Sequence, residues 1–176
     1  MKPLATIRKA RKEDAHAIAD VLLKTWQASY QGHVPQDYLN GLTLEKTEDF
    51  WGETLSRSRS PRFQTFVAVL DERLVGILSM GPSRDEDLDS ESTAEVYSIY
   101  VLPDNWRRGI GHSLMETATE EMRTQGLRTA ILWVLETNVR TRRFYEAAGW
   151  RSDGAVKDQE FGKARARVMR YRVALA

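Results

Sequence analysis

The chain has 176 residues, with 26 Lys and Arg against 25 Asp and Glu, a formal net charge of +1, and no cysteine. This length and a hydrophobic content of 41% are typical of one globular domain, which we expect to span residues 1–176. The missing cysteines exclude disulfides and a thiol nucleophile, and the near-neutral charge is unlike that of a nucleic-acid-binding module. No apolar run approaches a membrane span, so we expect a cytoplasmic protein that binds neither nucleic acid nor membrane.

In the first half of the chain, apolar spacing predicts a strand, several helices and a hairpin. Apolar residues from Ala15 to Trp26 recur at the three- and four-residue spacing of one helix face. Two runs rich in β-branched residues are separated by three polar residues, a spacing that favours an antiparallel hairpin. The expected elements are a strand at 4–7, helices at 15–26, around 38–42 and from a Thr43 N-cap through 50–55, and hairpin strands at 66–70 and 74–80.

The second half alternates strands and helices after a polar segment. Residues 83–93 are acidic and poor in apolar side chains, so we expect an exposed loop there. Gly126 and Gly149 each follow a run with helical spacing, at the position where a helix commonly ends. A strand, a helix and a second strand in succession imply a right-handed crossover with the two strands parallel. The expected elements are strands at 94–102 and 129–135, helices from Ile110 and at 138–148, and a terminal hairpin of 150–158 and 165–173.

Glycines and arginines gather where the helix from Ile110 begins, in the sequence VLPDNWRRGIGH at 101–112. The first N–H groups of a helix have no acceptor within it and lie at the positive end of the helix dipole, so they suit a phosphate. Gly109 and Gly111 would let a ligand approach the backbone, and Arg107 and Arg108 add positive charge.

Two other phosphate motifs do not match this segment. A P-loop requires Lys and then Ser or Thr after the glycine, whereas His112 follows Gly111. The dinucleotide fingerprint requires a third glycine where Leu114 stands. By itself, the segment is equally consistent with a glycine-rich turn that only begins a helix.

A second segment, NVRTRRFYEAAGW at 138–150, follows the next strand. Together the two segments resemble the GNAT superfamily of acyl-CoA-dependent N-acyltransferases. One family motif is an apolar-x-Val-x-Pro strand end followed by Gln/Arg-x-x-Gly-x-Gly/Ala, which residues 99–103 and 109–111 match, with Trp106 in place of Gln or Arg. The other is Asn-x-x-Ala/Ser-x-x-Phe-Tyr-x-x-x-Gly-Phe/Trp, matched by Asn138, Phe144, Tyr145, Gly149 and Trp150, with Thr141 at the small position.

The resemblance implies an α/β (α+β) fold with a single mixed, mostly antiparallel sheet of about seven strands, helices on both faces and a splayed parallel pair, strands 4 and 5. The pantetheine arm of acetyl-CoA would lie between the splayed strands and pair with their backbone as an added strand would. Amides of 107–112 would hold the diphosphate without a metal. The residues implied for cofactor binding are Ile99, Tyr100, Val101, Arg107, Arg108, Gly109, Ile110, Gly111, His112, Asn138 and Phe144.

The resemblance also implies an N-acetyltransferase, which needs a proton donor for the leaving thiolate and a group that takes the proton of the amine. Tyr145 is the expected donor, and its alternative role is an aromatic core residue with a satisfied hydroxyl. Glu95 is either the base or the partner of a neighbouring arginine. Since the chain has neither cysteine nor a Gly-x-Ser-x-Gly elbow, we expect the amine to attack directly in a ternary complex.

In such folds the acceptor pocket is built by the first helices and the loop before the fourth strand. Trp26, Tyr30 and His33 are therefore pocket candidates, although Trp26 also has the spacing of a core residue. The acidic residues of 83–93 would either attract a cationic amine or form a solvated loop. We expect a monomer or homodimer that acetylates a small primary amine such as a polyamine, amino acid or antibiotic. The alternatives are acetylation of a protein N-terminus or lysine, and a catalytically silent acyl-CoA sensor.

Overall fold

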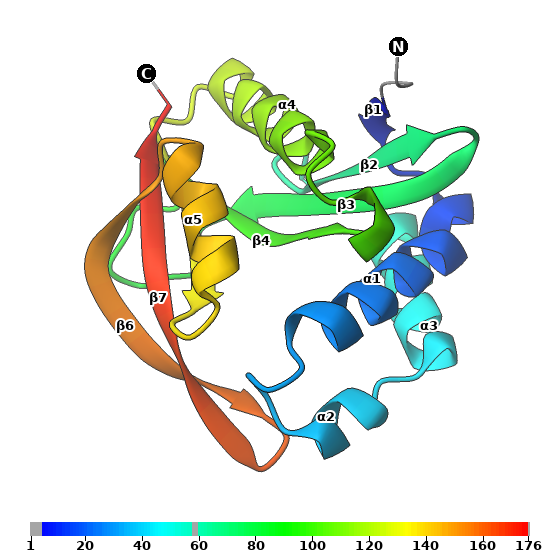
Figure 1. The fold of residues 1–176 in the computed structure, drawn as a ribbon. Coiled ribbons are helices and arrows are strands. Elements are labelled where there is room, and N and C mark those ends of the chain that lie inside the picture. Colours follow the sequence, from blue (N-terminus) through cyan, green and yellow to red (C-terminus); the bar gives the residue numbers. More distant parts are fainter. Residues whose placement is uncertain (1–4, 58–59, 176) are drawn as a thin grey trace.

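The computed structural model describes residues 5–57 and 60–175. These residues form one seven-stranded sheet in the order β1-β2-β3-β4-β5-β7-β6 (Figure 1). Within it, β4 and β5 are parallel and the other neighbouring strands are antiparallel. The strands are β1 (Thr6–Lys9), β2 (Gln64–Leu70), β3 (Arg73–Pro82), β4 (Thr93–Val101), β5 (Thr129–Leu135), β6 (Arg151–Phe161) and β7 (Ala164–Ala174).

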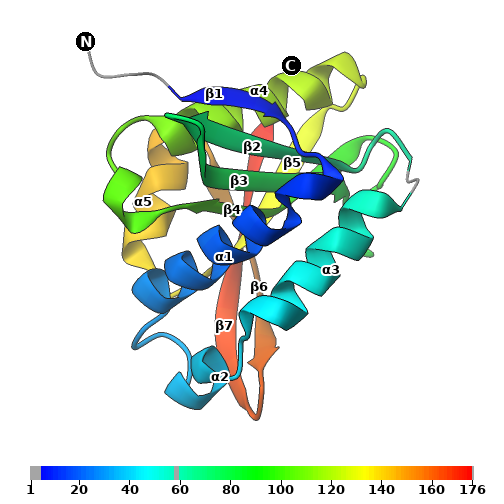
Figure 2. The same ribbon diagram turned by 90° about the vertical axis from the view of Figure 1, so that its right-hand side faces the viewer.

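Helices cover both faces of this sheet. Figures 1 and 2 show α4 and α5 on one face and α1 and α3 on the other, with α2 beside the tip of the β6–β7 hairpin. The bounds are α1 (Ala15–Ser29), α2 (Gln36–Asn40), α3 (Leu44–Ser56), α4 (Ile110–Thr124) and α5 (Val139–Ala147), and single 3₁₀ turns lie at Lys12–Asp14 and Pro103–Asn105. No helix within the described ranges is long and apolar enough to cross a membrane.

Each face has its own apolar core because residues alternate along the strands. Leu114 of α4 packs on the face to which Val96 and Leu132 point, whereas Ile18 of α1 packs on the face of Ile77. A third cluster joins α2 to the hairpin tip through Leu39, Phe161 and neighbouring side chains.

Most of the expected elements are confirmed. The hairpin at 66–80 forms as β2 and β3, α4 ends before Gly126 at φ 76°, and Thr43 caps α3 by accepting a hydrogen bond from the Lys46 N–H at 3.4 Å. The first strand lies later than expected, at Thr6–Lys9, and Leu4 lies outside the described residues. The mixed sheet with a parallel β4–β5 pair is also confirmed.

The sheet opens between β4 and β5. The two strands pair from Thr93 opposite Thr129 only as far as Val96 opposite Leu132. At that point the β3–β4 register shifts, with Val96 opposite Met80 and Ser98 opposite Ser79, so Tyr97 is the extra residue of a β-bulge. Beyond it, β4 continues along β3 and β5 continues along β7, and the two strands therefore diverge.

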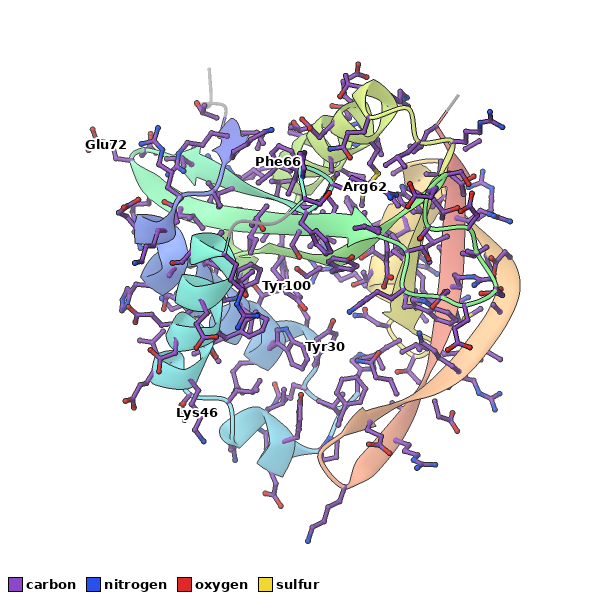
Figure 3. All side chains as sticks on the ribbon, turned by 180° about the vertical axis from the view of Figure 1, so that it is seen from behind. Tyr30, Lys46, Arg62, Phe66, Glu72 and Tyr100 are labelled. Carbon is purple, nitrogen blue, oxygen red and sulfur yellow. The ribbon has the colours of Figure 1, made fainter. Side chains whose placement is uncertain are left out.

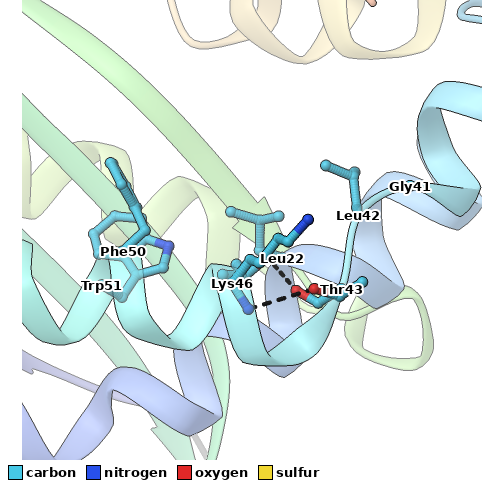
Figure 4. A pocket seen from close by; sticks show the side chains of 8 residues that line it. Leu22, Gly41, Leu42, Thr43, Lys46, Phe50 and Trp51 are labelled. Carbon is cyan, nitrogen blue, oxygen red and sulfur yellow. Dashed lines mark hydrogen bonds between the residues drawn. The ribbon is translucent and has the colours of Figure 1, made fainter.

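A small pocket of about 190 Å³ lies between α1 and the start of α3 (Figure 4). The polar groups of Thr43 already have local partners: the Thr43 hydroxyl accepts from the Lys46 N–H, and the Thr43 carbonyl accepts from the Thr47 hydroxyl at 2.8 Å. These bonds hold the first turn of α3 in place, so Thr43 is explained by its role as a helix cap.

Candidate active site

A cavity of about 990 Å³ occupies the opening between β4 and β5 and reaches both faces of the sheet. On the α4 and α5 face it is lined by the 105–112 segment and by the first turns of α5 with Phe144 and Tyr145. On the α1 face it is lined by Tyr30, His33 and other side chains of the strands and of the segment after α1. Two ligands that enter from opposite faces could therefore meet inside the sheet.

Backbone geometry at the start of α4 suits an anion. Gly109 is the N-cap with φ 79°, and the first turn closes through the Ser113 N–H to the Gly109 carbonyl at 3.0 Å. The N–H groups of residues 110–112 precede that bond and have no acceptor within the helix. A Cβ at Gly111 would lie 3.3 Å from the Phe144 ring, whereas a Cβ at Gly109 would meet nothing within 4 Å. Gly109 is thus required for its left-handed conformation, and no side chain of the protein fills the space beside it that was expected for a ligand.

Positive side chains surround this turn. Arg107 and Arg140 line the cavity, and the Arg140 guanidinium lies 3.6 Å from the centre of the Trp106 ring. Burial, and then the nearby charge of Arg107, lower the pKa of Arg140. Arg108 is exposed and is not among the described residues that line the cavity, so its expected contact with the cofactor is not supported.

Trp106, which stands where the family motif has Gln or Arg, is hydrogen-bonded to the last residue of β4. Its indole Nε1 donates to the Val101 carbonyl at 2.7 Å, and the Thr25 hydroxyl donates to the same carbonyl at 3.3 Å. Because both lone pairs of that carbonyl are engaged, Val101 cannot also use it to pair with an added strand. Ile99, which lines the cavity, remains available for the expected backbone pairing, and Tyr100 lines it beside Ile99.

Asn138 is buried at the start of α5 and lines the cavity. Its side-chain oxygen accepts from the Thr141 N–H at 3.2 Å and thereby caps the helix. The amide nitrogen is then the donor that Asn138 can offer to a ligand. Phe144 packs against Gly111 across the cavity.

Tyr145 is buried in the wall of the cavity. The centre of its ring lies 5.4 Å from the ring centre of Phe144, 6.4 Å from that of Trp150 and 6.3 Å from that of Tyr171. Burial, and then the nearby Tyr100 hydroxyl, raise the pKa of Tyr145. The hydroxyl therefore keeps its proton at neutral pH and is available as a donor.

Two more tyrosines line the cavity near Tyr145. Tyr30 and Tyr100 lie close to each other, from the end of α1 and from β4 (Figure 3). Burial, and then the neighbouring Tyr100 and Tyr145, raise the pKa of Tyr30 well above its usual value. Neutral phenols thus surround the point where the two strands diverge.

The position of α5 depends on a buried tyrosine that the sequence motifs did not indicate. The Tyr171 hydroxyl on β7 accepts from Arg142 Nε at 3.1 Å and donates to Glu146 Oε1 at 2.7 Å. Both partners lie on α5, so this hydroxyl holds the helix that carries Tyr145 against the sheet.

Glu95 does not occupy a position suited to a base. Its carboxylate is buried, accepts from Arg84 Nη2 at 2.6 Å and from Arg84 Nε at 3.2 Å, and also accepts from the Arg84 backbone N–H at 3.0 Å. It is absent from the described residues that line the cavity. Of the two roles that the sequence left open for Glu95, the structure favours the ion pair with an arginine over that of the base that takes the proton of the amine.

Of the three candidates for the acceptor pocket, Tyr30 and His33 line the cavity and Trp26 does not. His33 Nδ1 is hydrogen-bonded to the Thr137 hydroxyl at 2.8 Å, which joins the segment after α1 to the turn before α5. Trp26 packs with Tyr30, Tyr38, Tyr100 and Phe161 and is not among the described lining residues. The core role is therefore the correct one for Trp26.

The acidic segment 83–93 is a loop whose residues Glu86, Asp87, Asp89 and Glu91 are exposed, as expected, but it is not a free anionic patch. Arg170 of β7 is largely buried and donates to Asp85 at 2.9 Å, to Asp87 at 2.8 Å twice, and to Asp153 at 2.7 Å. These bonds tie the segment to the sheet, and hydrogen bonding to Asp87 is the main cause that raises the pKa of Arg170. The expectation of an exposed loop was wrong for Asp85, because a distant arginine neutralises it.

Trp133 is the main lining residue that sequence reasoning missed. It lies on β5 directly after Leu132, the last residue paired with β4, and its indole Nε1 donates to Asp85 Oδ2 at 3.0 Å. Its position follows from where the strands diverge, and the bulge that causes the divergence has no signature in the sequence.

The sequence is similar to those of known N-acetyltransferases. Residues 15–150 match the sequence model of the Acetyltransferase (GNAT) family. The chain is 35% identical over 137 residues to the uncharacterized N-acetyltransferase YuaI of Bacillus subtilis, with 77% of this chain and 74% of the relative covered. It is 24% identical over 147 residues to the spermidine N(1)-acetyltransferase of Thermoplasma acidophilum, with 82% and 87% covered.

The fold matches a solved structure as well. The PaiA N-acetyltransferase from Thermoplasma acidophilum, in complex with coenzyme A, superposes with a TM-score of 0.75 at 22% identity over 94% of this chain and 97% of that one. The family match covers most of the chain, and the opened parallel pair is in place. This protein is accordingly a member of the GNAT family and an acyltransferase.

Proposed function

We propose that this enzyme transfers the acetyl group of acetyl-CoA to the primary amine of a small molecule, by direct attack in a ternary complex. The observation that carries the proposal is the cavity that reaches both faces of the opened sheet. A phosphate-binding helix start lies on one face and a chamber of uncharged side chains on the other, so donor and acceptor can enter separately and meet.

The residues on the α4 and α5 face fit acetyl-CoA. The N–H groups of residues 110–112 and the guanidinium groups of Arg107 and Arg140 would hold the diphosphate. The hydrogen of Gly111 leaves a space beside Phe144 that a larger residue would fill. Ile99 and the Asn138 amide would hold the pantetheine arm. When bound, acetyl-CoA supplies an acetyl group activated as a thioester.

Tyr145 would hold and deliver a proton. Its hydroxyl is protonated at neutral pH because burial and Tyr100 raise its pKa, and it lies in the cavity wall. Donation to the departing sulfur would stabilise the transition state more than the ground state. Glu95 is saturated by Arg84, so we assign no carboxylate of the described chain to the base role, and water would take the proton of the amine.

The Tyr145→Phe variant tests this function. The ring and its packing remain, so CoA affinity and thermal midpoint should change little, whereas kcat should fall by about 10²-fold, near the lower end for general acids. Free CoA release with a panel of amines gives kcat, and titration calorimetry gives the affinity. Tyr171→Phe, which keeps the Tyr145 hydroxyl but removes the anchor of α5, serves as the structural comparison and should lower stability. A kcat of Tyr145→Phe within about twofold of wild type would remove Tyr145 as the acid.

A further inference from the structure

We infer that the acceptor is a monoamine with an uncharged, flat or apolar body, and that polyamines are poor substrates. This inference rests on the proposed function and concerns the acceptor end of the cavity on the α1 face. It departs from the substrate named for the Thermoplasma spermidine N(1)-acetyltransferase.

The described lining of the cavity offers no carboxylate to a second ammonium. Among the described residues that line it there is no Asp or Glu, and the charged ones are Arg107, Arg140 and Arg143 on the α4 and α5 face. A polyamine carries two or more positive charges, and burying a charge without an opposite charge is costly. The lining therefore favours an acceptor whose only ionisable nitrogen is the one that reacts.

Two carboxylates adjoin the lining residues Val96 and Trp133, and both are already paired. Glu95 accepts from Arg84, and Asp85 accepts from Arg170 at 2.9 Å and lies 3.5 Å from Lys157 Nζ. The indole of Trp133 also donates to Asp85 from the chamber side. An ammonium group of the acceptor would have to displace these internal cations to gain a carboxylate.

Aromatic rings offer the other common site for a cation, and cations of the protein already lie over two of the rings in this lining, Trp133 and Tyr97. Lys157 Nζ lies 3.9 Å from the centre of the Trp133 ring, and the Arg84 guanidinium lies 4.2 Å from the centre of the Tyr97 ring. Both rings line the cavity. The protein thus makes with its own side chains the cation–π contacts that would otherwise attract a polyamine.

The side chains that remain are flat and uncharged or only weakly polar. Tyr30 and Tyr100 supply aromatic surface, and Ser98 and His33 supply hydrogen-bonding groups. Such walls bury an apolar body favourably and can orient one amine. An arylalkylamine has this chemistry.

The experiment compares phenethylamine with spermidine in two assays. Initial rates of CoA release give kcat/KM for each amine, and calorimetry gives the affinity of each amine for the enzyme–CoA complex. We expect phenethylamine to exceed spermidine by tenfold or more in both. If neither amine, nor any other amine of a broad panel, is acetylated, the proposed function fails, while the affinities still decide the class of ligand.

Lys157→Met tests the cause of the discrimination, and Lys163→Met in the β6–β7 turn is the matched control. Lys157 is about half exposed, so its loss should leave the fold intact, and the thermal midpoint checks this. Removing the ammonium that lies over Trp133 should improve the relative use of spermidine about three- to tenfold, whereas Lys163→Met should leave the ratio unchanged.

Three results would overturn the inference. Spermidine could equal phenethylamine with the wild-type enzyme, in rate or in affinity for the CoA complex. A short peptide with a free N-terminus could be a better acceptor than phenethylamine. Finally, an unchanged amine ratio in Lys157→Met would show that the covered rings do not cause the discrimination.

Discussion

Arg170 holds the segment between β3 and β4 in place, and its removal should be costly. Only 8% of its side chain is exposed, and its guanidinium makes hydrogen bonds to Asp85, Asp87 and Asp153. In Arg170→Met the apolar part of the side chain is kept, and the carboxylates lose their shared cation. Any loss of stability then reports the electrostatic contacts and not a cavity.

The magnitude follows from which carboxylates stay buried. Removing one partner of a buried ion pair costs about 3–5 kcal/mol. We expect the lower end, because Asp85 keeps the Trp133 indole and Lys157, and Asp153 keeps the Ala155 N–H at 3.0 Å. For a chain of this size, a loss of about 3 kcal/mol lowers the thermal midpoint by roughly 6–12 °C.

Equilibrium denaturation in urea, followed by tryptophan fluorescence and by circular dichroism, measures the loss of stability. Asp87→Asn is the matched control: it removes the negative charge and one of the two acceptor oxygens that face Arg170, but 61% of the Asp87 side chain is exposed and water can replace the lost bond, so its effect should be much smaller. If the free energy of unfolding of Arg170→Met lies within about 1 kcal/mol of the wild-type value, the contacts of Arg170 with the three aspartates do not anchor the segment.

Three other predictions follow from the site and the ion pairs. Gly111→Val should weaken CoA binding at least tenfold in titration calorimetry, because a Cβ would already lie 3.3 Å from Phe144; unchanged affinity would contradict the phosphate-site assignment. Glu95→Gln should lose about 1–3 kcal/mol of stability but keep a pH–rate profile parallel to wild type, whereas a loss of turnover confined to low pH would restore the base role. The Arg8 side chain, hydrogen-bonded at 2.7 Å, lowers the pKa of Asp14. The stabilisation that the ionised Asp14 carboxylate gains from Arg8 should be complete above about pH 4 and lost as pH falls through the lowered pKa of Asp14. Arg8→Met should therefore make the free energy of unfolding depend less on pH in this acid range. An unchanged acid transition would exclude a contribution from this pair.

The sequence predicts local structure well because local structure follows from nearby residues. Helix ends at glycine and strand hairpins across short polar turns depend on neighbours in the chain, and α4 with its end before Gly126 and the β2–β3 hairpin formed as expected. The strand–helix–strand order predicted the parallel pair, and the resemblance to a family predicted that this pair would splay apart.

Long-range pairing could not be predicted in the same way. Asp85 meets a partner 85 residues away, and Glu95 is neutralised by Arg84 across a turn whose shape depends on that contact. Charge patterns alone could not distinguish a cation-attracting loop from an anchored one. The position of Trp133 in the cavity likewise depends on where β4 and β5 separate, which is set by tertiary packing.

The bulge at Tyr97 also restricts how this protein can vary during evolution. Because side chains alternate along a strand, one extra residue decides which of the following side chains face α1 and which face α4. Deleting a single residue between Val96 and Ser98 would exchange the environments of Ile99 and Tyr100. Point substitutions can therefore reshape the chamber one side chain at a time, whereas a one-residue change in length reverses the whole end of β4. New acceptor preferences in this scaffold should arise through substitutions in a strand of constant length.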